Sequence, residues 1–162
     1  MKRTLYTVLA SAVFLAMLTA TKKRRKPREA GSIPKLTIPS TTGWASHEVA
    51  GIRFVTPPNA TVTRADQLGA IRIQLASGKE LAFSPTAIDI PARRSSWSTD
   101  FVMFDAPDAA IVLHELGSGD ECQALACSSV PVLGSPLCID GFSRNNDECT
   151  QVVAIARSIQ PR

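Results

Sequence analysis

The chain has 162 residues, enough for one domain of typical size after a short leader. Its net charge of +4 is unevenly distributed, because residues 1–42 carry nine Lys and Arg against the single acid Glu29. The other 120 residues carry nine basic and thirteen acidic side chains, a net charge of −4. A face that binds nucleic acid needs positive charge on the folded part of the protein. We therefore exclude DNA and RNA as partners of the domain.

The first twenty residues have the layout of a secretory signal peptide. Lys2 and Arg3 precede the apolar run Leu5–Leu18, and small residues precede a cut after Ala20. The alternative is a retained signal anchor, since an uncharged stretch of about eighteen residues is near the lower limit for a membrane span. Positive charge after the apolar run would favour keeping the following chain in the cytoplasm. We nevertheless expect export to the periplasm, the cell envelope or the medium, with a membrane anchor as the alternative.

The sequence Leu18-Thr19-Ala20 resembles the start of a bacterial lipoprotein lipobox, an apolar residue followed by two small ones. In lipoproteins the next residue is the cysteine that receives the lipid, and here it is Thr21. The resemblance therefore implies export without a lipid.

Residues 21–43 are expected to form a basic, Pro-containing tether ahead of a folded domain at 44–162. Pro27, Pro34 and Pro39 favour an extended chain. Clustered basic residues gain about 1 kcal/mol each near anionic lipid headgroups, so association with a membrane surface is a further hypothesis. The residues of this basic cluster are Lys22, Lys23, Arg24, Arg25, Lys26 and Arg28.

The domain alternates apolar and polar residues with the period of β-strands. The clearest hairpin joins Ala70–Leu75 to Glu80–Phe83 through the turn at Ser77-Gly78-Lys79. The other predicted strands are Gly51–Val55, Phe101–Phe104 paired with Ala110–Leu116, and Cys122–Val130 paired with Leu137–Phe142. Residues 84–98 are predicted to form a loop with a short helical turn.

One helix is predicted over Asp147–Ile159. Asn145 followed by Glu148 is typical of a capping box, and Pro161 ends the run. The apolar positions of the helix, which share one face, are Cys149, Val152, Ile155, Ala156 and Ile159. The predicted fold class is α+β, a meandering antiparallel sheet with a C-terminal helix packed on one face, in two layers.

The strand that ends in Phe-Val-Thr-Pro-Pro and the helix that ends in Ala-Arg-Ser-Ile resemble the PsbP-like group of small extracytoplasmic domains. The resemblance covers the layout of Val49 to Gln160, while its motif-like parts are limited to Gly51–Pro58 and the terminal helix. It implies an accessory or ligand-associated module and transfers no catalytic residue.

The four cysteines are expected to form two disulfides, as in exported domains with an even number of cysteines. We favour Cys122–Cys127 with Cys138–Cys149, while Cys127–Cys138 across a hairpin with Cys122–Cys149 remains open. Intervening gaps of four, ten and ten residues are unlike the paired spacing of zinc sites, so no metal is expected.

His114 is the candidate for chemistry, with Asp120 or Glu121 as a carboxylate partner in a hydrolase or a metal-dependent enzyme. Adjacent residues of a strand point to opposite faces, which separates His114 from Glu115. The motifs Gly-x-Ser-x-Gly, Gly-x-Gly-x-x-Gly and Walker A do not occur in the sequence.

Arg93, Arg94 and Trp97 form a candidate binding loop, because guanidinium groups beside an indole suit a carboxylate or a sugar face. The prediction is an extracytoplasmic module that binds a small ligand or an envelope protein, without catalysis and without a cofactor. The alternatives are the enzyme that uses His114 and a membrane-anchored protein whose basic cluster contacts lipid.

Overall fold

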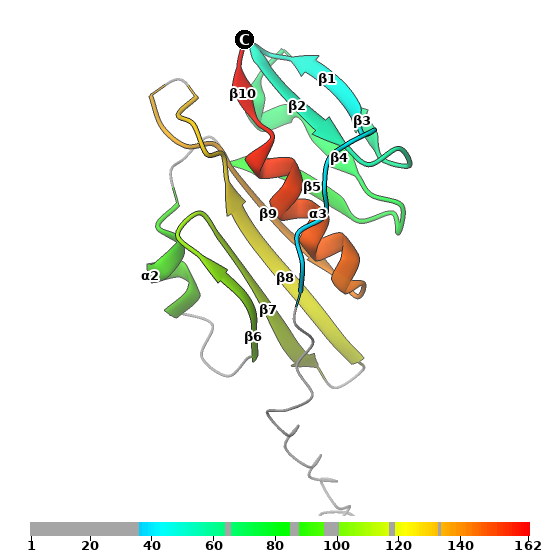
Figure 1. The fold of residues 1–162 in the computed structure, drawn as a ribbon, viewed down its shortest axis with the longest axis vertical. Coiled ribbons are helices and arrows are strands. Elements are labelled where there is room, and N and C mark those ends of the chain that lie inside the picture. The colour runs from blue at the N-terminus through cyan, green and yellow to red at the C-terminus, as the bar shows by residue number, and fades with distance from the viewer. Residues whose placement is uncertain (1–35, 64–65, 85–87, 96–100, 117–118, 133) are drawn as a thin grey trace, which may run out of the picture. The chain divides into compact units, whose positions relative to one another are not determined.

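The computed structural model describes residues 36–63, 66–84, 88–95, 101–116, 119–132 and 134–162. Residues 33–162 form one folded unit, which contains two antiparallel sheets and a C-terminal helix (Figure 1). The predicted signal at residues 1–20 and the basic cluster at residues 22–28 lie outside the described residues. Within the described residues, no helix has the length and apolarity needed to cross a membrane.

The smaller sheet has three strands in the order β1-β2-β10, which are β1 (Ala45–Val49), β2 (Ile52–Thr56) and β10 (Gln160–Pro161). A two-residue turn joins β1 to β2, and both of its residues have positive φ, 49° at Ala50 and 78° at Gly51. Such a turn matches the right-handed twist of the two strands. Glycine adopts this conformation at little cost, whereas alanine rarely does.

The larger sheet has seven antiparallel strands in the order β3-β4-β5-β9-β8-β7-β6. The predicted hairpin is confirmed, with Ile73 opposite Leu81. The predicted second and third strand pairs are also present. However, β9 lies between β5 and β8, so the sheet consists of two meanders joined side by side. The strands are β3 (Thr61–Thr63), β4 (Arg72–Gln74), β5 (Glu80–Ser84), β6 (Phe101–Ala106), β7 (Ala109–Leu116), β8 (Gly119–Cys127) and β9 (Cys138–Ser143).

The predicted C-terminal helix is α3 (Asn146–Arg157), which packs on β8 and β9. Its N-terminus is capped by Asn145, whose Oδ1 accepts a hydrogen bond of 2.9 Å from the backbone N of Asp147. Val152 and Ile155 of the predicted apolar stripe are buried, so the helix covers one face of the sheet. The α+β class with a C-terminal helix on an antiparallel sheet is therefore confirmed.

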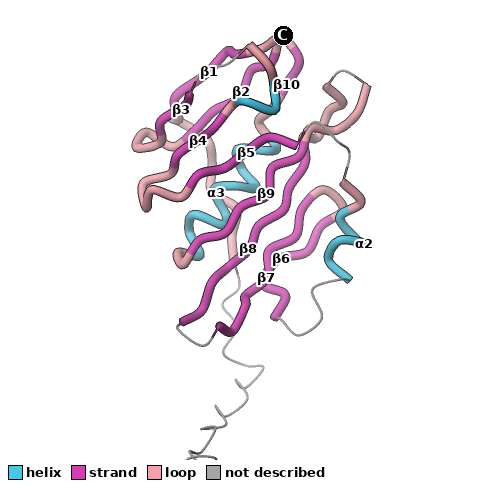
Figure 2. The backbone as a smooth tube through the Cα atoms, turned by 180° about the vertical axis from the view of Figure 1, so that it is seen from behind, coloured by secondary structure: helices cyan, strands magenta, loops and turns pink. Residues whose placement is uncertain are grey.

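Buried side chains form two clusters on opposite faces of the seven-stranded sheet. The main core lies between the sheet and α3, and it includes Leu81, Ile139 and Ile155. A smaller cluster lies on the other face, under the six-residue helix α2 (Ile90–Ser95). Figure 2 shows that other face in front of α3, with α2 at its side. Its members are Ile90, Ala110, Leu125, Cys127 and Cys138.

The segment before β1 also contributes to packing. Leu36 and Ile38 are partly buried against the main core. Ile38 and Ser40 line a depression together with Ala154 and Arg157 of α3. Packing in the folded unit thus extends to residues before Trp44.

The two disulfides join Cys122 to Cys149 and Cys127 to Cys138, so the favoured connectivity was wrong and the alternative is correct. Cys122 and Cys127 lie on the same strand, β8, five positions apart. They point to opposite faces, with about 16 Å of strand between them. Cys127 is instead directly opposite Cys138 on β9, while Cys122 faces α3 and reaches Cys149 in its first turn.

Candidate functional site

The face of the seven-stranded sheet opposite α3, here called the open face, carries a row of side chains that crosses four strands. Val102 is the register partner of Val112, Val112 of Gln123, and Gln123 of Phe142. Directly opposite residues in an antiparallel sheet point to the same side, so the four side chains share this face. Val102 is 41% exposed and Phe142 is 46% exposed. Two large apolar side chains therefore meet solvent on one face.

A hydrogen-bonded chain runs across the open face beside this row. His114 Nε2 and Gln123 Oε1 are 3.0 Å apart, and Gln123 Nε2 donates to Asp140 Oδ1 over 3.0 Å. Because a carboxylate only accepts hydrogen bonds, Asp140 fixes the orientation of the Gln123 amide. The amide oxygen then faces His114, so the Nε2 atom of His114 must carry the proton. The imidazole ring is held 5.9 Å from the ring of Phe142, measured between centroids.

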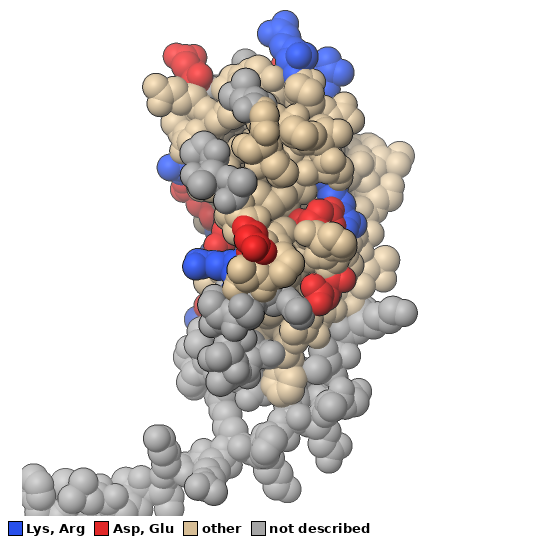
Figure 3. All heavy atoms as spheres, turned by 90° about the vertical axis from the view of Figure 1, so that its left-hand side faces the viewer, with Lys and Arg blue, Asp and Glu red and all other residues tan. Residues whose placement is uncertain are grey.

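Charged side chains surround this centre. Glu80 forms an ion pair of 3.1 Å with Arg72, and Glu121 forms one of 3.4 Å with Arg144. Arg72 and Arg144 oppose four acids, because the register also places Asp105 and Asp140 on this side of the sheet. Among the described residues of the strands and of the β9–α3 junction, the open face thus carries the four acids Glu80, Asp105, Glu121 and Asp140 against two arginines. On the side of the molecule drawn in Figure 3, acidic and basic side chains are interspersed over a largely uncharged surface.

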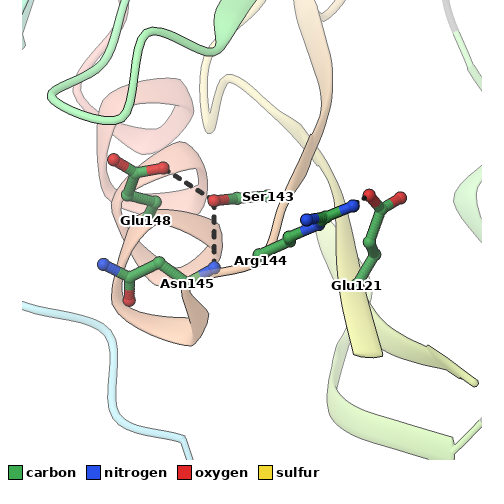
Figure 4. Close-up of polar contacts among 5 residues, drawn as sticks. All are labelled: Glu121, Ser143, Arg144, Asn145 and Glu148. Carbon is green, nitrogen blue, oxygen red and sulfur yellow. Dashed lines mark hydrogen bonds and ion pairs between the residues drawn. The ribbon is translucent and has the colours of Figure 1, made fainter. Parts of the chain in front are cut away.

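The junction between β9 and α3 sends neighbouring side chains to opposite sides. In Figure 4, Ser143 points to Glu148, and Arg144 points away towards Glu121. The carboxylate of Glu148 accepts three hydrogen bonds, from the backbone N of Ser77 (2.9 Å), from Ser77 Oγ (2.6 Å) and from Ser143 Oγ (2.7 Å). The predicted capping box is only half present, because the backbone N of Asn145 donates to Ser143 Oγ (3.1 Å) and not to Glu148.

Glu148 is buried, with 3% of its surface exposed. Burial raises the pKa of this carboxyl, but the hydrogen bonds from Ser77 and Ser143 and the charge of Lys79 outweigh it and hold the pKa below its usual value. A depression of about 350 Å³ lies beside these groups, lined by Ser77, Lys79, Ser143, Arg144 and Asn145. Since its three bonds tie the β4–β5 turn to β9 and α3, we assign Glu148 a structural role.

An ion pair ties the end of α3 to the turn between β6 and β7. Arg157 donates from Nε (2.7 Å) and Nη2 (2.8 Å) to the two carboxylate oxygens of Asp108. This bidentate bond lowers the pKa of Asp108 and raises the pKa of Arg157. The guanidinium group of Arg157 also lies 5.6 Å from the ring centroid of Phe104.

The predicted site residues are only partly brought together. Glu121 is the register partner of His114 and shares its face, whereas Asp120 is the register partner of Glu115. Arg93 is an exposed residue of α2. Trp97 and the side chain of Arg94 lie outside the described part of the chain.

Sequence reasoning missed Gln123, Asp140 and Phe142. A signal was present, because Asp140 and Phe142 alternate with Ile139 in a predicted strand. An inward Ile139 places Asp140 and Phe142 together on the other face. An aromatic residue on a face shared with a carboxylate is a candidate contact residue. A comparison with protein-family models and with curated protein sequences finds no match to this chain.

Proposed function

We propose that this chain is an extracytoplasmic binding module without catalysis, and that the open face contacts a protein partner. The partner surface would present an apolar side chain flanked by Lys or Arg. The observation that carries the proposal is the exposure of Val102 and Phe142 on one face and in one row.

The energetics of Phe142 support this proposal. About 90 Å² of its surface is exposed, taking a phenylalanine side chain as about 200 Å². Covering that surface would stabilise a complex by about 2 kcal/mol. The hydrogen-bonded chain through Gln123 keeps His114 and Asp140 in fixed positions beside the ring, so little side-chain entropy would be lost on binding.

Charge supports a partner with basic groups. Four acids and two arginines lie on the described strands and the β9–α3 junction of the open face, and these two arginines are engaged with Glu80 and Glu121. Asp140 lies two positions before Phe142 on β9, so a basic group of the partner could reach its carboxylate while an apolar group covers the ring. Electrostatic complementarity of this kind steers association and selects partners.

The disulfides support the compartment that we propose. Both pairs of cysteines are oxidised, which is typical of proteins that live in an oxidising compartment. A cleavable signal over residues 1–20 would deliver the domain to the periplasm, the envelope or the medium, and a retained anchor is the alternative. The lipoprotein-like start and the PsbP-like layout are compatible with an accessory envelope module and stay predictions.

The enzyme hypothesis has one observation in its favour, because His114 and Glu121 face each other across β7 and β8. His114 also contacts Gln123, and Glu121 pairs with Arg144. We propose the binding module, because the exposed row that contains Val102 and Phe142 supports it directly.

Selection of random linear peptides displayed on phage, with the full oxidised chain as bait, tests this proposal. We expect enriched peptides that combine apolar and basic residues. Their binding should be lost with Phe142→Ser and weakened with Asp140→Asn. It should persist with Val130→Ser, the matched control, because Val130 is 40% exposed but lies in the β8–β9 connection. A lack of enrichment, or equal binding by Phe142→Ser and the original chain, would rule out the open face as the contact surface.

A further inference from the structure

The two disulfides lie in different surroundings. Cys122–Cys149 belongs to the main core under the twelve-residue helix α3, with exposures of 1% and 0%. Cys127–Cys138 belongs to the smaller cluster on the other face, where Ile90 of α2 covers it. Exposing the first pair requires opening the main core, whereas exposing the second requires opening the small cluster to which Ile88 and Ile90 contribute.

The element that packs over Cys127–Cys138 is short. Helix α2 has six residues, and a helix of that length has little stability of its own in water. A cavity of about 170 Å³ opens beside it, lined by residues that include Ile88, Ile90, Pro107 and Cys127. Local opening of such elements costs less free energy than global unfolding. Cys127 lines this cavity and is 4% exposed, while Cys138 does not line it and is fully buried.

We propose that Cys127–Cys138 is an exchangeable disulfide that reacts with a dithiol reductant when α2 opens, and that Cys122–Cys149 is permanent. A thiolate of the dithiol attacks Cys127 Sγ, the S–S bond breaks, and Cys138 leaves as a thiolate. The second thiol of the reductant, as a thiolate, then attacks the first sulfur of the reductant and displaces Cys127 as a thiolate. The dithiol thus becomes a disulfide, and its two protons convert both cysteine thiolates into thiols. The proposal does not depend on what binds the open face.

The fold around this pair does not depend on the S–S bond. The backbone N of Cys127 donates to the carbonyl of Asp108 (2.8 Å), and the backbone N of Ser128 donates to the carbonyl of Leu137 (2.9 Å). These bonds hold β8 between β7 and β9 after reduction. Reduction would therefore free two thiols without unfolding the sheet.

The test is a time course of reduction of the full oxidised chain by dithiothreitol under native conditions. Thiols are alkylated at each time point and identified by peptide mass spectrometry. We expect Cys127 and Cys138 to be alkylated at least about tenfold faster than Cys122 and Cys149, because the opening that exposes them is local. Alkylation of all four cysteines at one rate, or of Cys122 and Cys149 first, would overturn the proposal.

Two variants separate local from global opening. Ile90→Ala loosens α2 and should speed the reduction of Cys127–Cys138 several-fold while leaving Cys122–Cys149 unchanged. Leu68→Ala, the control, removes a partly buried side chain that packs against the main core and not against α2. It should not selectively speed the reduction of Cys127–Cys138. Equal effects of Ile90→Ala on both disulfides, or none, would show that α2 does not control access.

Discussion

Replacing Glu148 by alanine should destabilise the domain more than replacing Glu121, a carboxylate of the open face, by alanine. The substitution leaves Ser77 N, Ser77 Oγ and Ser143 Oγ without their acceptor at a site that is 3% exposed. Hydrogen bonds to charged groups contribute about 1.5–3 kcal/mol each, but the buried charge opposes them and the three contributions are not additive. We expect a loss of about 2–4 kcal/mol in the free energy of unfolding.

The pH dependence of this stabilisation is set by the lowered pKa of Glu148. Between the folded pKa and the unfolded value of about 4.3, the unfolded chain binds more protons than the folded one. The contribution of the carboxylate is therefore complete above the unfolded pKa and is lost as the pH falls through the folded pKa. The Glu148→Gln variant cannot titrate, so its deficit relative to the original chain should shrink on acidification.

Urea denaturation of the oxidised chain, followed by circular dichroism at pH 7 and at pH 3, measures both effects. Glu121→Ala is the matched control, because it removes a carboxylate whose partner Arg144 is 68% exposed. An exposed pair contributes about 1 kcal/mol or less. Equal losses for Glu148→Ala and Glu121→Ala would refute the structural role of Glu148. A Glu148→Gln deficit that grows with acidification would refute the origin of its pKa.

Two further substitutions test the packing between the sheet and α3. Gly141→Ala should destabilise the domain by about 1–3 kcal/mol in thermal unfolding, because the added Cβ would clash with the buried Cδ2 of Leu81. An unchanged melting temperature would contradict this packing. Asp108→Asn should lower the free energy of unfolding in urea at pH 7 by about 1 kcal/mol, because it weakens the bidentate bond to the partly exposed Arg157. This deficit should become smaller at acidic pH, because Asp108 is then protonated in the original chain. A deficit that does not change with pH would contradict the ion pair.

The predicted hairpin and the terminal helix were readable because each has a strong local signal, whereas β1, β3 and β10 were not predicted. Ile71, Ile73 and Leu75 alternate with polar residues, and all three are buried on one side of the predicted hairpin. Val152 and Ile155 fix the face of α3 by their helical spacing. Such patterns specify which side of an element is buried, and this was sufficient to predict the α+β class.

The neighbours of each element were harder to predict. Nothing local in β5 or β9 indicates that the two strands pair, because more than fifty residues separate Ser84 from Cys138 in the sequence.

The error in the predicted disulfide connectivity had a different origin. The strand predicted from Cys122 onwards already contained Cys127 at an odd spacing, and two residues so placed cannot bond across a straight strand. Applying the strand period to the cysteines would have excluded the favoured connectivity.

The contacts that stabilise the fold and the side chains that are exposed lie on opposite faces of β8 and β9. On the α3 side lie the Cys122–Cys149 disulfide, the clash-sensitive Gly141 and the Glu148 cluster, all of which hold the helix to the sheet. On the open face, Phe142 is half exposed, and its ring lies 5.9 Å from the ring of His114. Removing its ring deletes few buried contacts, so the free energy of unfolding should change little. A loss of peptide binding in Phe142→Ser with unchanged urea unfolding would therefore assign the residue to binding, because a folding defect could not produce the first effect without the second.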